Sequence, residues 1–393
     1  MIKLIKSTFY KEKETKKELC SFITNATQLS FGQECQKFEE RFATHQKRKY
    51  CIFFNSGSSA NFALIQALFN LKILKQSDKA AFSAVTWSTN PMPLIQLGLN
   101  IIPVDVELET LNVSSRTLVD VIDRNPLKVF FLTNLLGFCD DIDKIANICK
   151  ERKIVLIEDN CEALGSVYKN KKLGNFGLAS TFSFYVGHHM STVEGGAVCT
   201  DNESLAIMLK LVRAHGWDRN LSLDQQDKIR KKYKVESSFY AQYTFYDLGL
   251  NFRPTEINGF LGNRQLNYLN EINKRRNANF LQLAESLYLQ KDKFLRIRYD
   301  HMDFVSNFAF PVICRTQKFR DQLIKKCEGK IEIRPIVGGD MTEQPFFRKY
   351  VKHLDERFNC TNAKLIHKNG LYFGNNPELT NAELIKIIKI FST

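Results

Sequence analysis

The chain has 393 residues, and 44% of them are hydrophobic, which is enough apolar material for one large and one smaller globular domain. Its 56 lysines and arginines outnumber its 42 aspartates and glutamates, so the formal net charge is +14. A charge of this sign favours an anionic partner such as a nucleic acid, a membrane surface or a phosphorylated metabolite.

The positions of the basic residues and cysteines further restrict the expected partner and compartment of the protein. Basic residues occur without a zinc-finger, RNP or helix-turn-helix signature, so we expect no nucleic-acid partner and interpret basic runs such as 274–276 as solvated faces. No segment approaches the roughly 20 apolar residues that span a bilayer, and the N-terminus has no apolar run of signal-peptide length. The ten cysteines are scattered without CxxC pairs, which is typical of reduced thiols. We therefore expect a cytoplasmic protein without a membrane partner.

The first part of the chain predicts two helices and a strand. Residues 1–30 have the pattern of a polar amphipathic helix, 38–44 belong to a second helix, and Tyr50–Phe54 is the first buried strand. We expect the arm before this strand to serve only in packing.

A possible phosphate cradle follows the first strand. The sequence Asn-Ser-Gly-Ser-Ser-Ala leads into a helix over 60–69, so Gly57, Ser58 and Ser59 lie where a strand passes into a helix N-terminus. Backbone N–H groups, the helix dipole and two hydroxyls can bind a phosphate at such a place. Taken alone the signal is weak, because a serine before a helix is most often an N-cap.

Strand, loop and helix units repeat between residues 50 and 200. The repetition predicts a mainly parallel, doubly wound α/β sheet, whose ligands bind at the carboxyl ends of the strands. The expected strands cover 79–85, 100–104, 129–133, 154–157 and 181–185, and a helix covers 142–150.

Polar and aromatic residues follow these strands. Trp87 can cover a planar ligand or simply cap the core. Asp159 follows a buried strand directly, so its carboxylate needs a cation or a protonated ring nitrogen as its partner. His188 and His189 stand between a strand and the Glu-Gly-Gly turn at 194–196. Because no other Cys or His with ligand spacing is nearby, we expect no metal.

The second half predicts a change of domain. Residues 222–238 are interpreted as a polar loop, and Thr255 as the N-cap of a long helix that runs to about Leu289. We place the boundary inside this helix, which gives a large α/β domain over 1–262 and a small α+β domain over 263–393. The other expected elements are a helix over 205–212, strands over 309–313 and 331–333, and helices over 316–326 and 381–391.

These motifs, in this order, resemble a known family. Its central motif is S-F-x-x-x-K-x-x-x-x-G-E-G-G, which the chain matches at 183–184 and 194–196, with His188 at the lysine position and Val193 at the first glycine. Over nearly its whole length the chain resembles the nucleotide-sugar aminotransferase family (DegT/DnrJ/EryC1/StrS) of fold type I pyridoxal phosphate enzymes. The resemblance implies an aspartate-aminotransferase-like α/β fold with a large, mostly parallel sheet and a smaller C-terminal α+β domain.

The resemblance also assigns roles to site residues. Asp159 would keep the pyridine nitrogen protonated and Trp87 would stack on the ring. Glu162 would hydrogen-bond near the cofactor, or only cap a helix turn. Asn251 would reach the phosphate in the neighbouring subunit, which implies a homodimer with active sites at the subunit interface. The residues that would hold the phosphate within one subunit are Gly57, Ser58, Ser59 and Ser183.

Histidine in place of lysine changes the implied chemistry. Lysine has a reference pKa of about 10.4 and histidine of about 6.5, so His188 is a free base near neutral pH and cannot bind the cofactor covalently. The sequence resembles a subgroup of 3-dehydratases that act on GDP-linked 4-keto-6-deoxy sugars. This implies noncovalent pyridoxal or pyridoxamine 5′-phosphate, a nucleotide-linked 4-keto sugar and glutamate as partners, and His188 as the general acid and base that removes the 3-hydroxyl.

Three more residues could bind substrate: His215, Arg219 and Arg334. They would contact phosphates or the glutamate carboxylate, although a helix cap for the histidine and surface ion pairs for the arginines are equally open. A related CDP-sugar enzyme with this histidine needs an iron–sulfur cluster whose ligands include a C-x-C pair. This chain has no C-x-C, so we expect no cluster.

Two other functions stay open at this stage. An ordinary sugar aminotransferase could use Lys169, Lys171 or Lys172 in place of the missing lysine. A chain without the lysine could also be a non-catalytic binding or regulatory protein, although the retained Asp159 and Trp87 argue against this. The sequence does not decide between a hexose and a heptose, nor which nucleotide carries it.

Overall fold

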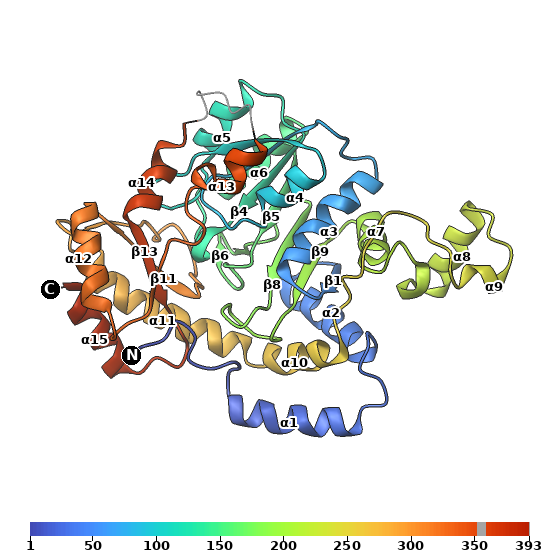
Figure 1. Ribbon diagram of the computed structural model, residues 1–393, viewed down its shortest axis with the longest axis horizontal. Helices are drawn as coiled ribbons and strands as arrows, with labels where there is room; N and C mark the ends of the chain where they lie inside the picture. The colour runs from blue at the N-terminus through green and yellow to red at the C-terminus, as the bar shows by residue number, and fades with distance from the viewer. Residues whose placement is uncertain (352–358, 393) are drawn as a thin grey trace.

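The centre of the molecule is a seven-stranded sheet, seen in the computed structural model, which describes residues 1–351 and 359–392 (Figure 1). Its strands are β1 (Tyr50–Phe54), β2 (Lys79–Ser83), β3 (Asn100–Val104), β4 (Val129–Thr133), β5 (Val155–Asp159), β8 (Ala179–Ser183) and β9 (Gly196–Thr200). They lie in the order β1-β9-β8-β5-β4-β2-β3. From β8 to β3 all neighbours are parallel, whereas β9 is antiparallel to β8 and β1. The predicted mainly parallel α/β sheet is confirmed.

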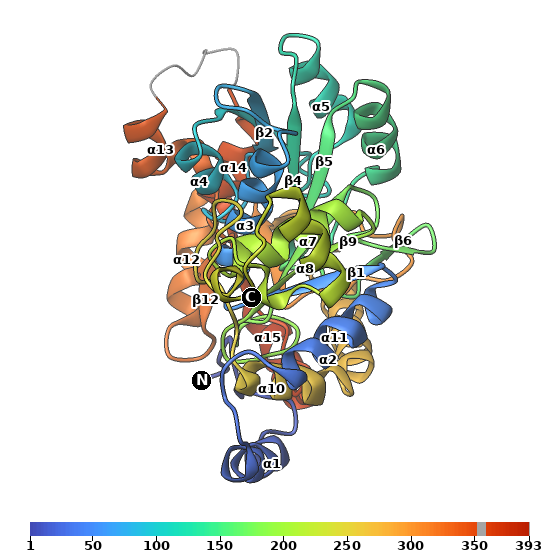
Figure 2. The ribbon, with the colours of Figure 1, turned by 90° about the vertical axis from the view of Figure 1, so that its right-hand side faces the viewer.

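Helices cover both faces of this sheet. The helices that do so are α3 (Gly57–Asn70), α4 (Pro91–Gln96), α5 (Ser115–Ile122), α6 (Ile142–Glu151), α7 (Glu203–Arg213) and α11 (Leu269–Leu287). Apolar residues of α3, α4 and α7 form one core layer, and those of α5, α6 and α11 form the other (Figure 2). Because both faces are covered, the strands must be continuous apolar runs, and all five residues of β4 are indeed buried.

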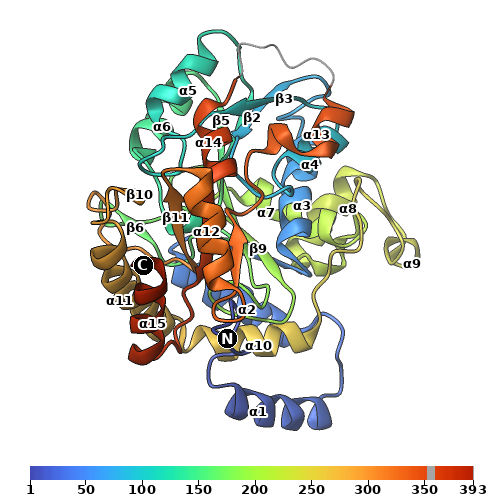
Figure 3. The same ribbon diagram turned by 60° about the vertical axis from the view of Figure 1, so that its left-hand side comes forward.

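A second sheet is antiparallel and comes from the end of the chain. Its strands, in the order β10-β11-β13-β12, are β10 (Phe294–Leu295), β11 (Ala309–Cys314), β13 (Gly370–Gly374) and β12 (Ile333–Pro335), the last beginning two residues later than predicted. Ile2 pairs with Ile331 and the N–H of Leu4 donates to Glu332, so the start of the chain extends this sheet. The helices beside it (Figure 3) are α12 (Gln317–Cys327), α14 (Thr361–Asn369) and α15 (Asn381–Ser392), whereas α13 (Pro345–Tyr350) lies beside α4 and packs Phe347 against Phe82 of the large sheet. The domain boundary at residue 262 stays a prediction.

The predicted loop at 222–238 is wrong. The segment holds helices α8 (Leu223–Lys232) and α9 (Ser238–Ala241), because Ser222 and Gln225 form a capping box that starts α8. No residue of α8 is buried, which agrees with the prediction that the segment lies outside the core. In Figure 1 it projects to the right of the sheet.

Two predicted helices differ in extent. Thr255 is an N-cap as predicted, but the long helix is divided into α10 (Glu256–Leu266) and α11. The N–H of Tyr268 donates to the carbonyl of Gln265, three residues back, so the turn tightens there and the helix is interrupted. The helix predicted over 1–30 is reduced to α1 (Glu12–Asn25), with α2 (Gln33–Gln46) after it, because the first residues pair with the second sheet instead.

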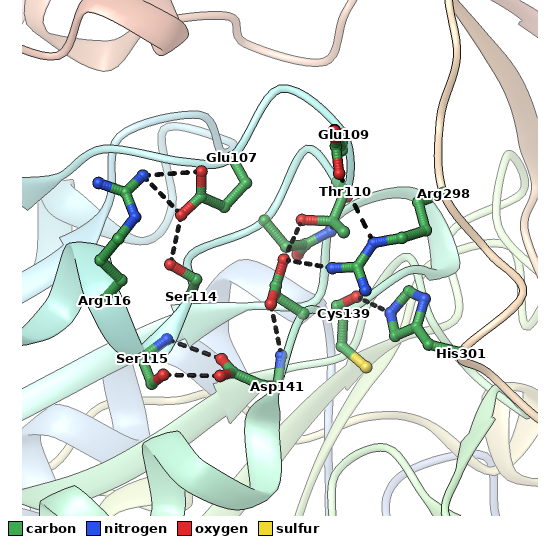
Figure 4. A network of polar contacts seen from close by, with 12 residues as sticks. Glu107, Glu109, Thr110, Ser114, Ser115, Arg116, Cys139, Asp141, Arg298 and His301 are labelled. Atoms are coloured by element: carbon green, nitrogen blue, oxygen red, sulfur yellow. Dashed lines mark hydrogen bonds and ion pairs between the residues drawn. The ribbon is translucent and has the colours of Figure 1, made fainter.

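A buried polar network connects the two sheets away from the pocket described below. Thr110 and Arg298 donate hydrogen bonds of 2.7 and 3.4 Å to Asp140, and burial raises the pKa of this carboxyl. Figure 4 shows Arg298 and His301 beside Thr110 and Cys139, and the ring Nε2 of His301 lies 2.8 Å from the Cys139 carbonyl oxygen. These contacts fix the segment before β11 to the loops of the large sheet.

Candidate active site

A pocket of about 460 Å³ opens at the carboxyl ends of β4, β5 and β8. The N-terminus of α3, the second sheet and residues 184–195, here called the histidine loop, complete its wall. This is the edge of the sheet where ligands were expected. The predicted site residues that line the pocket are Gly57, Ser58, Trp87, Asp159, Glu162, Ser183, His188 and Arg334. Those that do not line it are Ser59, His215, Arg219 and Asn251.

Asp159 ends β5 at the floor of the pocket and is 5% exposed. Its Oδ2 accepts hydrogen bonds from the side-chain amides of Asn61 (3.0 Å) and Asn90 (2.9 Å), and its Oδ1 from the N–H of Cys161 (2.9 Å). Sequence reasoning missed both asparagines. A signal existed for Asn61, since it is a polar residue inside the apolar helix α3 and is fully buried. The three donors fix the carboxylate while it still faces the pocket.

The start of α3 forms the predicted cradle, but Ser59 does not contribute to it as predicted. The N-cap is Ser56, whose hydroxyl accepts from the N–H of Ser59 and lies 3.0 Å from the Ser59 hydroxyl, and Ser59 itself does not line the pocket. Gly57 packs so closely that a Cβ there would lie 2.8 Å from the Cβ of Ser183. The helix N-terminus and the end of β8 therefore present backbone N–H groups and the hydroxyls of Ser58 and Ser183 together.

His188 lies on the wall of the pocket, on the histidine loop. Its ring contacts Phe308 and Tyr185 with edge-on geometry, at centroid distances of 5.3 and 6.0 Å. Its Nδ1 is buried and meets no hydrogen-bond partner in the described part of the chain. Desolvation lowers its pKa to about 4, against the opposing effect of the nearby Asp159 carboxylate. The imidazole is therefore a neutral base at neutral pH.

His189 and Glu162 behave differently from His188. His189 does not line the pocket, and its Nε2 lies 3.1 Å from the Ser306 carbonyl oxygen, which fits a supporting role for this residue. Glu162 lines the pocket and accepts a hydrogen bond of 2.9 Å from the N–H of Leu136, which holds that residue at a positive φ of 53°. Burial raises the pKa of Glu162 to about 8, so its carboxyl is largely protonated at neutral pH.

The outer wall of the pocket combines two predicted residues with a segment that the sequence did not single out. Leu4 and Ile5 line it, although the N-terminal arm was expected to serve only in packing. Arg334 also lines it and pairs with Glu332, whose other oxygen accepts the N–H of Leu4 at 3.0 Å. Trp87 is 55% exposed at this end. One carboxylate thus anchors both the arginine and the start of the chain.

The remaining predicted residues gather outside this pocket, at the base of the α8–α9 projection. His215 donates its backbone N–H to the carbonyl of Leu250, and the residue before it pairs with Asn251. The guanidinium of Arg219 lies 4.2 Å from the ring centroid of Trp217. These three predicted residues are therefore placed together, but not within the pocket of their own chain.

No lysine lines the pocket in the part of the chain that the structure describes. The nearest lysines in sequence belong to a hairpin of β6 (Val167–Tyr168) and β7 (Lys171–Lys172). There Lys169 pairs with Asp143 at 2.6 Å, and Lys172 donates to the carbonyl of His45 at 2.5 Å. Neither amine is available to replace the lysine that the motif lacks.

Among residues 1–351 and 359–392, no three His, Cys, Asp or Glu side chains are grouped so that they could hold a metal ion. No helix in the same part of the chain is long and apolar enough to cross a bilayer.

The sheet order, and the pocket that α3 and the histidine loop close at its strand ends, define a protein of the pyridoxal-phosphate aminotransferase fold. The model of the DegT/DnrJ/EryC1/StrS aminotransferase family matches residues 10–392, so the chain belongs to this family.

Within the family, the chain is similar to 3-dehydratases. It is 34% identical, over 90% of each chain, to the GDP-4-keto-6-deoxy-D-mannose 3-dehydratase of Escherichia coli O55:H7. A solved E. coli GDP-4-keto-6-deoxy-D-mannose 3-dehydratase with bound hydrated pyridoxal phosphate is 31% identical, with a TM-score of 0.88 over 100% of this chain and 99% of that one. A histidine-to-asparagine mutant of such an enzyme with bound GDP-perosamine gives a TM-score of 0.89 at 30% identity, covering 100% of both chains.

The residues of the pocket fit such a cofactor. The tight contact of Gly57 with Ser183 leaves a helix N-terminus open towards the pocket, which suits a phosphate. Asp159 is held by three donors and keeps lone pairs for a protonated ring nitrogen. Trp87 offers an exposed aromatic face at the pocket rim for stacking. The donor set therefore matches a phosphorylated pyridine.

Proposed function

We propose that the chain is a 3-dehydratase that removes the hydroxyl from carbon 3 of a GDP-linked 4-keto-6-deoxy sugar, with glutamate restoring the cofactor. The observation that carries the proposal is His188, which stands where the family has its lysine, in a pocket whose described lining contains no lysine. Without that amine the cofactor is held noncovalently, and the site favours elimination over amino transfer.

The residues of the pocket would bind the cofactor from three sides. Gly57, Ser58 and Ser183 would hold the phosphate, Asp159 would keep the ring nitrogen protonated, and Trp87 would cover the ring. When bound as pyridoxamine phosphate, the cofactor would supply an amine for the 4-keto group and a ring that takes up the electron pair left by the removed proton and returns it as the hydroxyl leaves.

His188 would move the protons of the elimination. Its lowered pKa makes it a free base at neutral pH, so it can accept a proton at the reacting carbon of the bound cofactor. The same imidazole, then protonated, can return the proton to the oxygen on carbon 3 of the sugar as it leaves. Phe308 and Tyr185 hold the ring and exclude water around it. One side chain thereby serves both ends of the reaction.

We further propose that the active unit is a homodimer in the cytoplasm, where nucleotide-linked sugars and glutamate are found. The base of the α8–α9 projection carries His215, Arg219 and Asn251 outside the pocket of its own chain, and burial together with nearby arginines lowers the pKa of Arg253 beside them. Large apolar side chains are exposed on the same projection, which supports burial against a second copy. They are Phe239, Tyr240, Tyr243, Phe245 and Leu248.

The product identifies the reaction. Purified protein is incubated with pyridoxal phosphate, glutamate and a panel of GDP-, CDP- and dTDP-linked 4-keto sugars, both hexoses and heptoses, and products are analysed by mass spectrometry. A 3-deoxy-4-keto sugar with release of ammonia supports the proposal, and the panel identifies the base and the sugar. A 4-amino sugar without loss of the 3-hydroxyl would instead identify an aminotransferase.

Two further measurements distinguish the proposed dehydratase from an aminotransferase with a substitute lysine and from a non-catalytic binding protein. After borohydride treatment of the cofactor-loaded protein, a reduced lysine adduct would contradict the histidine mechanism. Glutamate should convert the aldehyde absorbance band of added pyridoxal phosphate into the amine band. No conversion, together with tight, salt-sensitive DNA binding, would favour a binding protein instead.

A further inference from the structure

Helix α11 carries a buried arginine directly behind the histidine loop. Arg276 is 5% exposed, although the basic run 274–276 was interpreted as a solvated face, and that prediction is wrong for this residue. Its Nη1 donates to the carbonyls of Phe308 and Asn375, and its Nη2 donates to the carbonyl of His188 at 3.2 Å. Phe308 precedes β11 and Asn375 follows β13, so one guanidinium joins the histidine loop to two strand ends of the second sheet.

This cation is unusual because it has no carboxylate partner. In the described part of the chain every acceptor of Arg276 is a backbone carbonyl, and its Nε has none. Burial lowers its pKa to about 9. A buried charge without a counter-charge is destabilising, so packing alone gives no reason for an arginine at this place.

Neighbouring polar residues of α11 perform the packing with neutral amides. Asn277 donates to the carbonyl of Val305, and Asn279 to that of Asn376. Asn277 thus binds the segment before β11, and Asn279 binds the segment after β13. Neither side chain reaches the histidine loop. Arg276 alone adds that contact, and it alone adds a charge.

We propose that Arg276 is a positioning residue for the reaction, which fixes His188 by its carbonyl and presents its imidazole to the pocket. It acts from outside the pocket and touches neither cofactor nor substrate. The inference rests on the proposed function, because it assigns His188 the role of the base.

The charge of Arg276 has a second effect on His188. It lowers the pKa of His188 and of His189, while Asp159 raises that of His188. Loss of the arginine charge would remove the smaller of the two effects that lower the pKa of His188, so this pKa would rise while burial still holds it below the ordinary value. Activity that needs the neutral imidazole would then be lost at higher pH than in the wild type. The other charged or titratable groups that face His188 around the pocket are Cys161, Glu162, Tyr185, Glu194, Glu332, Arg334 and Tyr372.

The test compares Arg276→Met, Arg276→Lys and Asn277→Ala in the full-length, cofactor-loaded protein. We expect Arg276→Met to lower kcat about 10- to 100-fold, as for a misplaced catalytic group, with KM nearly unchanged. On the acidic side of its pH profile, kcat of Arg276→Met should begin to fall at a higher pH than in the wild type. Arg276→Lys should recover part of both effects. Asn277→Ala, the matched control, should lower the melting temperature without moving the pH profile.

Histidine NMR gives a readout that does not need turnover. The signal of His188, assigned by its absence in His188→Asn, should titrate at higher pH in Arg276→Met than in wild type. A folded Arg276→Met protein with the wild-type titration and kcat overturns the proposal, as does an equal pH shift in Asn277→Ala. If Arg276→Met does not fold, Arg276→Lys decides, and wild-type kcat in that variant overturns the positioning role. If the wild type shows no dehydration, the proposed function fails while the NMR comparison still tests the arginine.

Discussion

The contact of Gly57 with Ser183 makes a sharp prediction for the phosphate cradle. In Gly57→Ala the new Cβ would lie 2.8 Å from the Cβ of Ser183, about 0.6 Å closer than the 3.4 Å at which ordinary contact begins. Neither partner can rotate away, because both are Cβ atoms attached to the backbone. The N-terminus of α3 must therefore move from the end of β8 by about this amount.

The displacement should weaken the cofactor rather than the fold. Alanine is a better helix former than glycine, so we expect a melting temperature close to that of the wild type. A hydrogen bond to a charged group contributes about 1.5 to 3 kcal/mol, and loss of one from the phosphate should raise Kd about 10- to 100-fold. Kd is measured by titrating pyridoxal phosphate and following its absorbance.

A double variant separates the clash from other effects. In Ser183→Gly the opposing Cβ is absent, so adding Gly57→Ala to it should change Kd by less than about threefold. If Gly57→Ala alone binds pyridoxal phosphate as tightly as the wild type, the assignment of the cradle is refuted.

Three further predictions concern His188, Glu162 and the projection. His188→Asn should keep the cofactor Kd within about threefold while dehydration, followed by product mass, falls by at least about 100-fold; unchanged turnover would contradict the assigned role. Because burial raises the pKa of Glu162 to about 8, above its unfolded value, its protonated form favours folding at low pH and this contribution is lost as pH rises towards 8. The melting temperature of Glu162→Gln should therefore depend less on pH between pH 5 and 8 than that of the wild type. An unchanged pH dependence would contradict the raised pKa of Glu162. Phe239→Asp should shift the protein towards monomer in analytical ultracentrifugation, with Leu289→Asp as an exposed control outside the projection.

Much of the fold could be predicted from local pattern. The strands of a sheet covered on both faces must be short apolar runs, and β1, β3 and β4 were predicted with their observed bounds. His188 could be singled out from the sequence because the family motif fixes its position, and it does line the pocket. The segment 222–238 was predicted as a loop because its residues are polar. The capping box of Ser222, which is a local signal for a helix start, was therefore overlooked.

The rest of the site depends on contacts between distant residues, which a sequence pattern does not show. Arg276 lies in a basic run that looks like surface, and its burial follows only from the meeting of α11 with β11 and β13. Asn90 braces Asp159 across 69 residues. Leu4 belongs to an arm without any site motif, and it is held at the pocket by the pairing of Ile2 with Ile331 and by Glu332, which accepts the N–H of Leu4.

The start of the chain also sets an order for folding. Leu4 and its partner Glu332 are 328 positions apart, so this part of the wall can close only after all of the chain between them has been synthesised. Closing so long a loop is slow compared with the local pairing of neighbouring units in the large sheet. During refolding, recovery of activity should therefore lag behind recovery of secondary structure, and the finished pocket reports that two segments 328 positions apart have met.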